Sequence, residues 1–468
     1  MCGENRIAGL GSEKSQLGLR GAGLAGSRIG WAMWYLVQAP RQGRYPFRPI
    51  TVIERDQRRR LKDTISHAYR HVPYYRETMR RLGLAPGDFS SAPDLARLPL
   101  LERAEVQRDP ERFVSDARPI EQYLSESTGG SGGEPLTVYS DPFARVQGAA
   151  FYQRAGALHR SLAGRRLGCR TLLVGNPSPS VGSRRAVEQL LARGRKLTGA
   201  EVRVVSIRQP LERAIEEIDR FRPHILGSFG SYMEGLFAHL QKRGGRAHRP
   251  RLVIYGGEEM SAGARKLISE GFGIPVMSIY GAHEAAWPGF DCPAHLGFHI
   301  NEDLNPIRIV DGGGREVPDG ESGEVVISNL VNRGTTLLNY RLGDSARKLP
   351  IPCPCGRTLP LLSYVEGRVG DWVQTPGGGR INGMALRYLF SDERELRRYQ
   401  LVQRSPSHFA IALITWPDCD RVRLEARLAA KLVDLLGAGT TVEFAFVEDL
   451  PRTKVGKVRT VVGLDRPS

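Results

Sequence analysis

Residues 125–135 read SESTGGSGGEP, so glycines and hydroxyl side chains dominate one short stretch. Glycines let backbone N–H groups approach an anion closely, and Ser and Thr add hydroxyl donors, so this stretch could bind phosphate groups. A flexible linker is the competing interpretation, because Gly/Ser-rich chains behave as coils. The stretch lacks the G-x-x-x-x-G-K-[ST] pattern of the common nucleotide-binding loop. Its flanks favour an ordered loop, since a strand-like TVYSD and an Asp-Pro-started helical pattern over 141–160 follow it.

The elements that would position such a loop alternate between residues 171 and 327. Short apolar runs such as TLLVG, HILGSF, RLVIYGG and PVMSIYG are separated by helical patterns. This alternation predicts an α/β domain with a mainly parallel sheet. Ligands of such sheets bind beyond the carboxyl ends of the strands. The turns at 256–259 (GGEE) and 280–284 (YGAHE), each directly after a strand pattern, are therefore candidate binding turns.

The remaining patterns divide the chain into three parts. Residues 1–50 are a Gly/Arg/Pro-rich lead-in that we expect to be partly disordered. The large domain spans 51–369; it starts with an amphipathic helix that breaks at Pro73, and it turns β-rich after residue 300, where Gly-Gly-Gly and Asp-Gly turns predict hairpins. Residues 370–468 read strand, helix, strand, which predicts a small α+β domain.

Composition excludes several classes of protein. The net charge of +17 would suit nucleic-acid binding, but the 67 Lys and Arg residues are nearly all Arg and are spread along the chain, which favours an ordinary basic surface. The six cysteines are too few and too irregularly spaced for a disulfide framework, so a reducing cytoplasm is expected. The apolar stretch at 29–37 is too short to span a membrane; it either packs onto the large domain or forms a peripheral helix.

Five stretches stand in order along the chain: the glycine-rich run, YGAHEA at 280–285, YRLGD at 340–344, EGRVGD at 366–371 and PRTKVGKVRT at 451–460. Together they resemble the adenylate-forming superfamily of acyl-CoA synthetases, and within it the phenylacetate-CoA ligase family with its capsule-biosynthesis-like relatives. The resemblance covers residues 55–460. It implies a large adenylate-forming domain with mainly parallel sheets and a β-rich subdomain, followed by a small mobile α+β domain.

The resemblance also implies roles for individual residues. Glu284 would bind Mg²⁺, Tyr280 would stack near the adenine of ATP, and Asp344 would accept hydrogen bonds from the ribose hydroxyls. Arg368 would contact the ribose and phosphates, and Lys457 would stabilise charge on the reacting carboxylate and phosphate oxygens. The implied catalytic residues are Lys457, His283 and Glu284, and the implied ATP-binding residues are Ser127, Thr128, Gly129, Gly130, Ser131, Gly132, Gly133, Gly256, Gly257, Glu258, Tyr280, Gly281, Asp344 and Arg368.

Three positions depart from the family pattern. Glu134 stands where many relatives carry a lysine after the glycines, so the lysine role is not carried over. His283 replaces the usual threonine, and its ring N–H would reach the α-phosphate. Gly370 falls at the hinge where relatives have Asp or Lys, and glycine permits the required dihedral change. Residues lining the acid pocket are expected from 227–234, 255–258 and 280–286.

Cysteine and histidine residues gather in two further stretches. FDCPAHLGFHI at 290–300 holds Cys292, His295 and His299, and CPCGRT at 353–358 holds Cys353 and Cys355. Such ligands from two separate stretches suit a tetrahedral structural zinc. Some members of the phenylacetate-CoA ligase family look similar here, and we expect Cys292, His299, Cys353 and Cys355 as ligands, with His295 as the competing one. A cluster of free thiols in a reducing cell is the alternative.

The resemblance implies an AMP-forming ligase. It would activate an aryl or arylacetic acid with MgATP as the acyl-adenylate and transfer the acyl group to CoA. A CoA-independent ligase that forms amides is one alternative, a basic zinc-containing nucleic-acid-binding protein is another, and an adenylation fold that has lost its chemistry is a third. Expected partners are the acid and CoA or another acyl acceptor, with no nucleic acid and no membrane, and a homodimer is left open.

Overall fold

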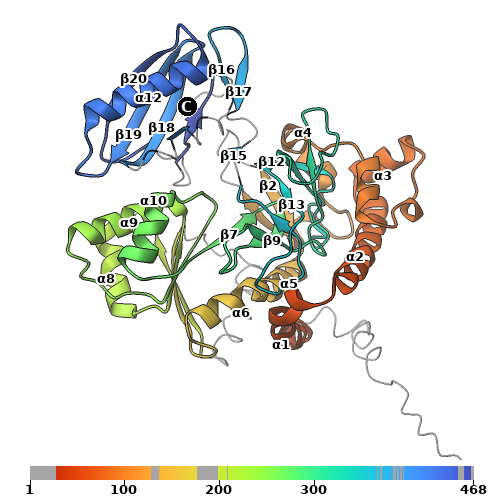
Figure 1. The fold of residues 1–468 in the computed structure, drawn as a ribbon. Coiled ribbons are helices and arrows are strands. Elements are labelled where there is room, and N and C mark those ends of the chain that lie inside the picture. Colours follow the sequence, from red (N-terminus) through yellow and green to blue (C-terminus); the bar gives the residue numbers. More distant parts are fainter. Residues whose placement is uncertain are drawn as a thin grey trace, which may run out of the picture.

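The computed structural model describes residues 28–127, 136–175, 199–207, 209–365, 367–368, 372–382, 386, 389–390, 393, 395–451 and 458–464. N-terminal helices and a β-rich region adjoin an α/β sheet, and a smaller domain made by the C-terminal part of the chain lies above α9 and α10 (Figure 1). Within the described residues, no helix is both long and apolar enough to cross a membrane.

Helix α1 (Arg28–Arg44) shows that the lead-in includes an ordered helix. Its aromatic side chains Trp31, Trp34 and Tyr35 pack with Phe143 and neighbouring apolar residues of the large domain. Of the two alternatives for the apolar stretch at 29–37, the structure therefore places the helix against the large domain. The predicted break at Pro73 is also observed: α2 (Ile50–His71) ends before the proline, and α3 (Pro73–Arg81) begins with it.

Smaller helical elements complete the N-terminal part. They are 3₁₀ turns at Tyr45–Phe47, Pro86–Asp88, Ala92–Arg97, Pro110–Phe113 and Ile120–Gln122, together with α4 (Arg103–Arg108), α5 (Pro142–Phe151) and α6 (Gln153–Leu162). Helix α5 begins where the Asp-Pro pattern predicts, because the Asp141 side chain accepts hydrogen bonds from the backbone N–H groups of Phe143 and Ala144.

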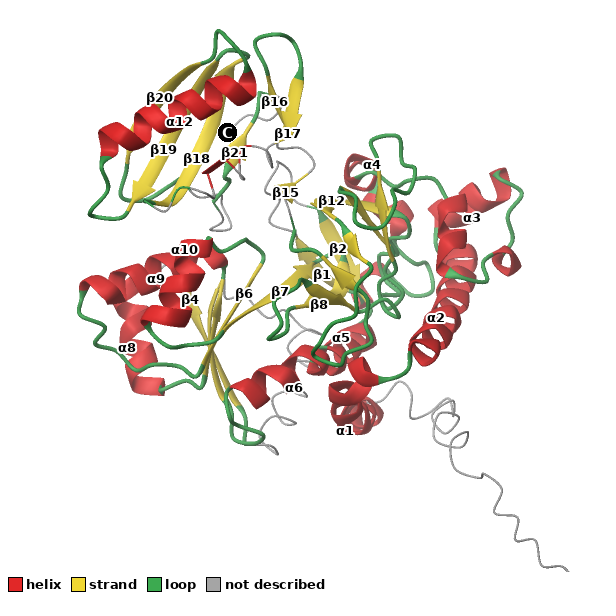
Figure 2. Cartoon of the chain, in the orientation of Figure 1, coloured by secondary structure: helices red, strands yellow, loops and turns green. Residues whose placement is uncertain are grey.

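A nine-stranded sheet forms the centre of the large domain, in the order β13-β14-β9-β8-β7-β6-β5-β3-β4 (Figure 2). The predicted parallel strands are β3 (Arg170–Gly175), β4 (Glu201–Ser206), β5 (Ile225–Ser228), β6 (Leu252–Gly256) and β7 (Val276–Ala282). The sequence did not predict that the sheet continues in antiparallel fashion through β8 (Ala285–Phe290), β9 (Phe298–Ile300), β14 (Leu361–Leu362) and β13 (Lys348–Leu349).

Apolar side chains of the inner parallel strands β5 and β6 are buried on both faces, which explains their continuous apolar runs. Leu226 and Val253 pack in the core with α8 (Leu211–Phe221), α9 (Gly230–Lys242) and α10 (Ala262–Lys266), which a short π-helical turn Leu267–Gly271 follows. Their neighbours Ile225, Leu252 and Ile254 pack in a separate cluster with Leu162 and Ala163, at the end of α6.

The predicted β-rich part folds as a four-stranded antiparallel sheet, β10 (Ile307–Val310), β11 (Gly323–Ile327), β12 (Tyr340–Ala346) and β15 (Gly367–Arg368). A separate hairpin pairs β1 (Leu124–Ser127) with β2 (Thr137–Ser140). The glycine-rich run connects these two antiparallel strands, so it is a hairpin connection within the fold and not a linker between domains.

The small domain has the predicted α+β composition. Its sheet has the order β20-β19-β18-β21, with β18 (Leu396–Ser405), β19 (His408–Thr415), β20 (Thr441–Phe446) and β21 (Val461–Val462), and α12 (Arg421–Leu436) buries a leucine every fourth residue against it. A ribbon of β16 (Trp372–Gln374) and β17 (Arg380–Asn382) adjoins it, with Val373 in the same core. β15 belongs to the large domain and Val373 to the small one; the predicted boundary at residue 370 lies outside the described residues and stays a prediction.

Candidate functional site

The two predicted binding turns lie side by side at the carboxyl edge of the parallel strands. Strands β6 and β7 are neighbours, and their register pairs Gly256 with Ile279. A Cβ at Gly256 would lie 2.9 Å from the carbonyl oxygen of Ile279, so only glycine permits this approach. A Cβ at Gly281 would meet no other atom within 4 Å, so this turn faces open space. The edge therefore offers exposed backbone to a ligand, as the sequence predicts.

Tyr280 links the YGAHE turn to the YRLGD strand. Its hydroxyl donates a 2.9 Å hydrogen bond to Oδ2 of Asp344, and its ring stacks on Phe298 with centroids 5.4 Å apart. Only 6% of Tyr280 is exposed, so most of its surface already contacts other protein atoms. The expected contact of Tyr280 with adenine stays a prediction.

Asp344 and Arg368, the two residues expected at the ribose, are opposite each other in the β-rich sheet. They are register partners in the antiparallel pairing of β12 with β15. The Asp344 side chain is largely buried. The pairing of β12 with β15 therefore brings the positions of Asp344 and Arg368 together at the edge of the β-rich sheet.

Glu284 forms an ion pair with Arg103. Its Oε1 lies 3.1 Å from NH1 of Arg103, at the start of α4, and only 10% of its side chain is exposed. Its backbone carbonyl accepts a 3.0 Å hydrogen bond from the side-chain amide of Asn329. The predicted metal-binding carboxylate is therefore fixed in place next to a cation. Sequence analysis missed Arg103, because 181 residues separate it from Glu284.

His283 projects outward from the same turn. More than half of its side chain is exposed, and its Nδ1 lies 3.9 Å from Oε2 of Glu126 in β1. Glu126 also pairs with Arg145 of α5. Nothing in the sequence pattern indicated Glu126 or Arg145, yet they place two opposite charges between the YGAHE turn and the start of the glycine-rich connection.

Two predicted groups lie outside the described residues. They are the glycine-rich run over 128–133 and Lys457. Of the neighbouring Ser127, only the backbone pairing with Thr137 is described. The residue after Lys457 is described: the backbone N–H of Val458 donates a 3.1 Å hydrogen bond to Oε1 of Glu258, in the GGEE turn. Glu258, expected at ATP, thus contacts the segment that carries Lys457.

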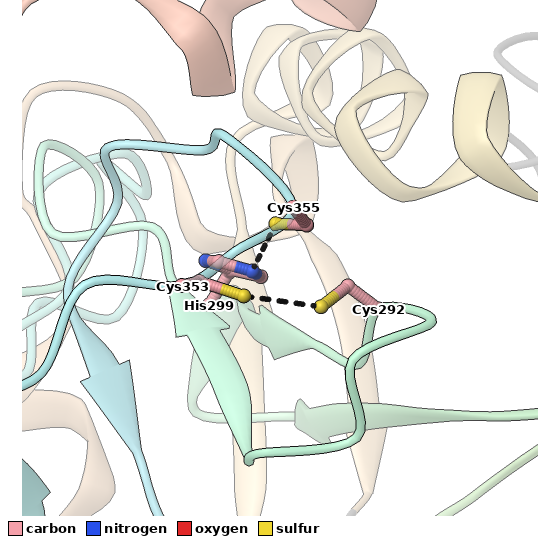
Figure 3. Close-up of side chains that lie close together, drawn as sticks. All are labelled: Cys292, His299, Cys353 and Cys355. Atoms are coloured by element: carbon pink, nitrogen blue, oxygen red, sulfur yellow. Dashed lines mark hydrogen bonds between the residues drawn. The ribbon is translucent and has the colours of Figure 1, made fainter.

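The four expected zinc ligands form one cluster (Figure 3). The donor atoms of Cys292, His299, Cys353 and Cys355 all lie within 4.8 Å of one another. The Sγ atoms of Cys292 and Cys353 are 3.6 Å apart, and Sγ of Cys355 is 3.2 Å from Nε2 of His299. A tetrahedral zinc with Zn–S bonds of about 2.3 Å would place its sulfur ligands about 3.8 Å apart. The cluster needs only small shifts to reach that geometry.

The competing histidine points elsewhere. Nδ1 of His295 lies 2.9 Å from Oδ2 of Asp291, outside the group of four donor atoms. His299 instead has Nδ1 3.3 Å from the Leu359 carbonyl oxygen, which leaves Nε2 toward the thiols. This arrangement, one ring nitrogen on a backbone carbonyl and the other on the metal, is the usual one for a zinc-bound histidine.

Comparison with known proteins identifies both domains. Residues 196–332 match the model of the AMP-binding enzyme family, and residues 373–463 match the CapK C-terminal domain. The phenylacetate-coenzyme A ligase of Thermus thermophilus is 26% identical over 445 residues, which span 87% of this chain and 96% of that protein. The ligase of the same name from Escherichia coli is 25% identical over 438 residues. The chain is thus similar to AMP-binding enzymes and to the CapK C-terminal domain in its two parts, and to phenylacetate-CoA ligases over most of its length.

Solved structures show the same fold. A 2-hydroxyisobutyryl-CoA ligase in its postadenylation state superposes with a TM-score of 0.71 at 18% identity, covering 90% of this chain and 91% of the other. The same ligase in its thioesterification state, with equal coverage, superposes with a TM-score of 0.59 at 19% identity. The arrangement of this chain is therefore more similar to the postadenylation arrangement.

Burial changes the pKa values of the Cys/His cluster. Burial raises the pKa of Cys292 to about 12 and lowers that of His299 to about 4, so His299 is neutral and able to bind a metal at pH 7. Burial also raises the pKa of Cys353, whereas hydrogen bonds from Arg357 hold that of Cys355 below its usual range against the effect of burial. Three thiols and one imidazole are a donor set that fits zinc and does not fit Mg²⁺ or Ca²⁺.

Proposed function

We propose that this protein is an AMP-forming ligase that joins a carboxylic acid to CoA through an acyl-adenylate. The observation that supports this best is that two family motifs from two sheets meet, where Tyr280 of YGAHE is hydrogen-bonded to Asp344 of YRLGD. The similarity to phenylacetate-coenzyme A ligases over 87% of the chain supports the same reaction class.

The reaction has two steps. A carboxylate oxygen of the acid attacks the α-phosphorus of MgATP, the bond to the bridging oxygen breaks, and pyrophosphate leaves. The thiolate of CoA then attacks the acyl carbon, the acyl–phosphate bond breaks, and AMP leaves. Two steps with a good leaving group replace one direct and difficult displacement of hydroxide.

The residues of the edge suit the first step. Glu284 would supply one carboxylate to Mg²⁺, which commonly takes one or two carboxylates together with phosphate oxygens. Its partner Arg103 lies 3.1 Å away and holds that carboxylate in place. Asp344 and Arg368 would hold the ribose, and the backbone of 128–133 would donate to the β- and γ-phosphates.

His283 and Lys457 are proposed to act on the reacting phosphate. His283 is exposed and only loosely associated with Glu126, so its ring N–H is available to an α-phosphate oxygen. Lys457 would stabilise negative charge as the carboxylate and phosphate meet. Its neighbour Val458 is hydrogen-bonded to the GGEE turn, which supports its approach to this edge.

We propose an aryl or arylacetic acid as the substrate class and CoA as the acceptor. Both proposals rest on the similarity to phenylacetate-coenzyme A ligases. A reducing cytoplasm is the proposed location.

We also propose a structural zinc held by Cys292, His299, Cys353 and Cys355. The ion would join the turn at 292–299 to the loop at 353–355 and would take no part in the reaction. The loop additionally contacts the N-terminal part, since the Thr358 backbone N–H donates a 2.8 Å hydrogen bond to the carbonyl of Pro46.

Pyrophosphate release tests the proposal. The purified protein is incubated with MgATP and a panel of aromatic and aliphatic acids, with and without CoA. Release with an aromatic acid, and stimulation by CoA with formation of the thioester, are the expected results. Release without thioester formation would instead point to a CoA-independent ligase, and no release with any acid would argue against adenylation.

A further inference from the structure

Two contacts join the small domain to the start of α9 and the adjoining GGEE turn in the large domain. The first is an ion pair: Nε of Arg398, in β18, lies 3.1 Å from Oε2 of Glu234, in the second turn of α9. Both side chains are mostly covered, with 15% of Arg398 and 5% of Glu234 exposed. Figure 1 shows the small domain above α9 and α10.

The second contact uses Glu258. One of its carboxylate oxygens accepts the Val458 N–H, and the other lies 3.4 Å from the backbone nitrogen of Ser231, in the first turn of α9. The GGEE turn and α9 are fixed to each other, because Gly230 approaches the Glu259 carbonyl so closely that no Cβ would fit. Glu234 and Glu258 therefore lie in one closely packed part of the large domain, and each contacts a different segment of the small domain.

The environment of Glu234 makes its pairing significant. Burial raises the pKa of this carboxyl group, and the charge of Arg398 opposes that effect. The other groups facing it are the backbone N–H of Ser261, which donates to it, and the more distant charge of Arg397, whose guanidinium stacks over Trp416 in the small domain. Both cations belong to the small domain, so rotation of that domain would separate the carboxylate from both of them.

Glu234 was expected among the residues that line the acid pocket. Its carboxylate instead forms an ion pair with Arg398 and accepts a hydrogen bond from the backbone N–H of Ser261. The pair also occurs in an arrangement that is more similar to the postadenylation state of a related fold than to its thioesterification state.

We propose that Glu234 and Arg398 are positioning residues for the first half-reaction. Their ion pair, with the Glu258–Val458 hydrogen bond, holds the small domain against α9 and the GGEE turn while the acyl-adenylate forms. The pair opens when the small domain turns for acyl transfer. This inference rests on the proposed function.

Measuring the two half-reactions separately tests the pair. In Arg398→Gln, acid-dependent ATP–pyrophosphate exchange is expected to fall about ten- to a hundredfold, since misplacing a catalytic group slightly has effects of this size. Conversion of chemically prepared acyl-adenylate and CoA to thioester is expected to remain within about twofold of wild type. Arg398→Lys should restore part of the exchange. Arg423→Gln, at a side chain of α12 that is 83% exposed, is the matched control and should change neither rate.

A double-mutant cycle distinguishes loss of the Glu234–Arg398 interaction from unrelated damage at either residue. Glu234→Gln keeps an oxygen for the Ser261 N–H and removes the charge, so it should lower exchange as Arg398→Gln does. The double variant should be no worse than either single one, because both remove the same interaction. Additive losses, or equal losses in both half-reactions with a lower melting temperature, would overturn the proposal.

Small-angle X-ray scattering gives a result that does not depend on the reaction. Without substrates, Arg398→Glu is expected to increase the radius of gyration relative to wild type and to Arg423→Glu, because the domain is released. An unchanged scattering profile would contradict the ion pair as a domain contact. If wild type shows no exchange with any acid but the scattering changes as expected, the proposed function fails while the domain contact stands.

Discussion

The hydroxyl of Tyr280 donates to the carboxylate of Asp344 across 2.9 Å, although 64 residues separate them. One residue ends a strand of the parallel sheet and the other lies in the β-rich sheet. The hydrogen bond therefore fixes the position of the carboxylate expected at the ribose relative to the turn expected at the phosphates. Preorganisation of this kind reduces the conformational freedom lost when a ligand binds.

Asp344→Asn is predicted to weaken ATP binding. The amide oxygen still accepts the Tyr280 hydroxyl, but a charged acceptor for the ribose hydroxyls is lost, which we expect to raise the KM for ATP about tenfold. Tyr280→Phe should have a smaller effect, because the Asp344 charge remains. Steady-state kinetics of pyrophosphate release measure both variants. Equal KM values for wild type and Asp344→Asn would remove Asp344 from the ATP site.

Glu284→Gln and Arg103→Gln are predicted to shift the Mg²⁺ dependence in opposite directions. The first removes a metal ligand and should raise the Mg²⁺ concentration for half-maximal activity about tenfold. The second removes the cation that competes for the same carboxylate, and should lower that concentration by about threefold. Magnesium titrations at fixed ATP measure both. A parallel shift in the two variants would contradict competition for Glu284.

Zinc binding is predicted to require His299 and not His295. Elemental analysis of the purified protein should find one zinc per chain in wild type and in His295→Ala, and little in His299→Ala or Cys353→Ser. Loss of the metal should lower the melting temperature, because it releases the joined loops. Zinc that persists in His299→Ala, or vanishes in His295→Ala, would show that the ligand set is wrong.

Buried His159 is predicted to make stability depend on pH. Burial lowers its pKa to about 4, and neither ring nitrogen has a hydrogen-bond partner. Between the unfolded pKa of about 6.5 and a folded value near 4, the unfolded chain binds the extra proton, so stability is present above pH 6.5 and is lost as the pH falls toward 4. His159→Leu should reduce this slope by up to about 1.4 kcal/mol per pH unit. Urea unfolding at several pH values measures it, and an unchanged slope would contradict this assignment.

Local patterns predicted much of this molecule. The parallel strands, the break at Pro73 and the start of α5 at Asp141 follow from apolar runs and helix-capping chemistry within a few residues. The cysteine–histidine cluster was also predictable, because its donor types are rare and their spacing restricts the choices. Each of these features depends on residues that are near one another in sequence or unusual in kind.

Contacts between distant parts of the chain were not predictable in this way. Arg103 and Arg398 are two among many arginines, and nothing in their neighbours indicates that they pair with Glu284 and Glu234. The antiparallel continuation of the central sheet depends on the pairing of β9 with β14, which lie about sixty residues apart. Such pairings are decided by packing of the whole domain, and a single sequence carries no local pattern for them.

The proposed adenylation can be tested by acid-dependent exchange of labelled pyrophosphate into ATP, measured for wild type and Lys457→Ala. We expect exchange by wild type with an aromatic acid, in the absence of CoA, and a loss of at least about a hundredfold in Lys457→Ala, with an unchanged melting temperature. Undiminished exchange in Lys457→Ala would contradict the assignment of the catalytic lysine. Absence of exchange by wild type across the acid panel would contradict the claim that this chain forms acyl-adenylates.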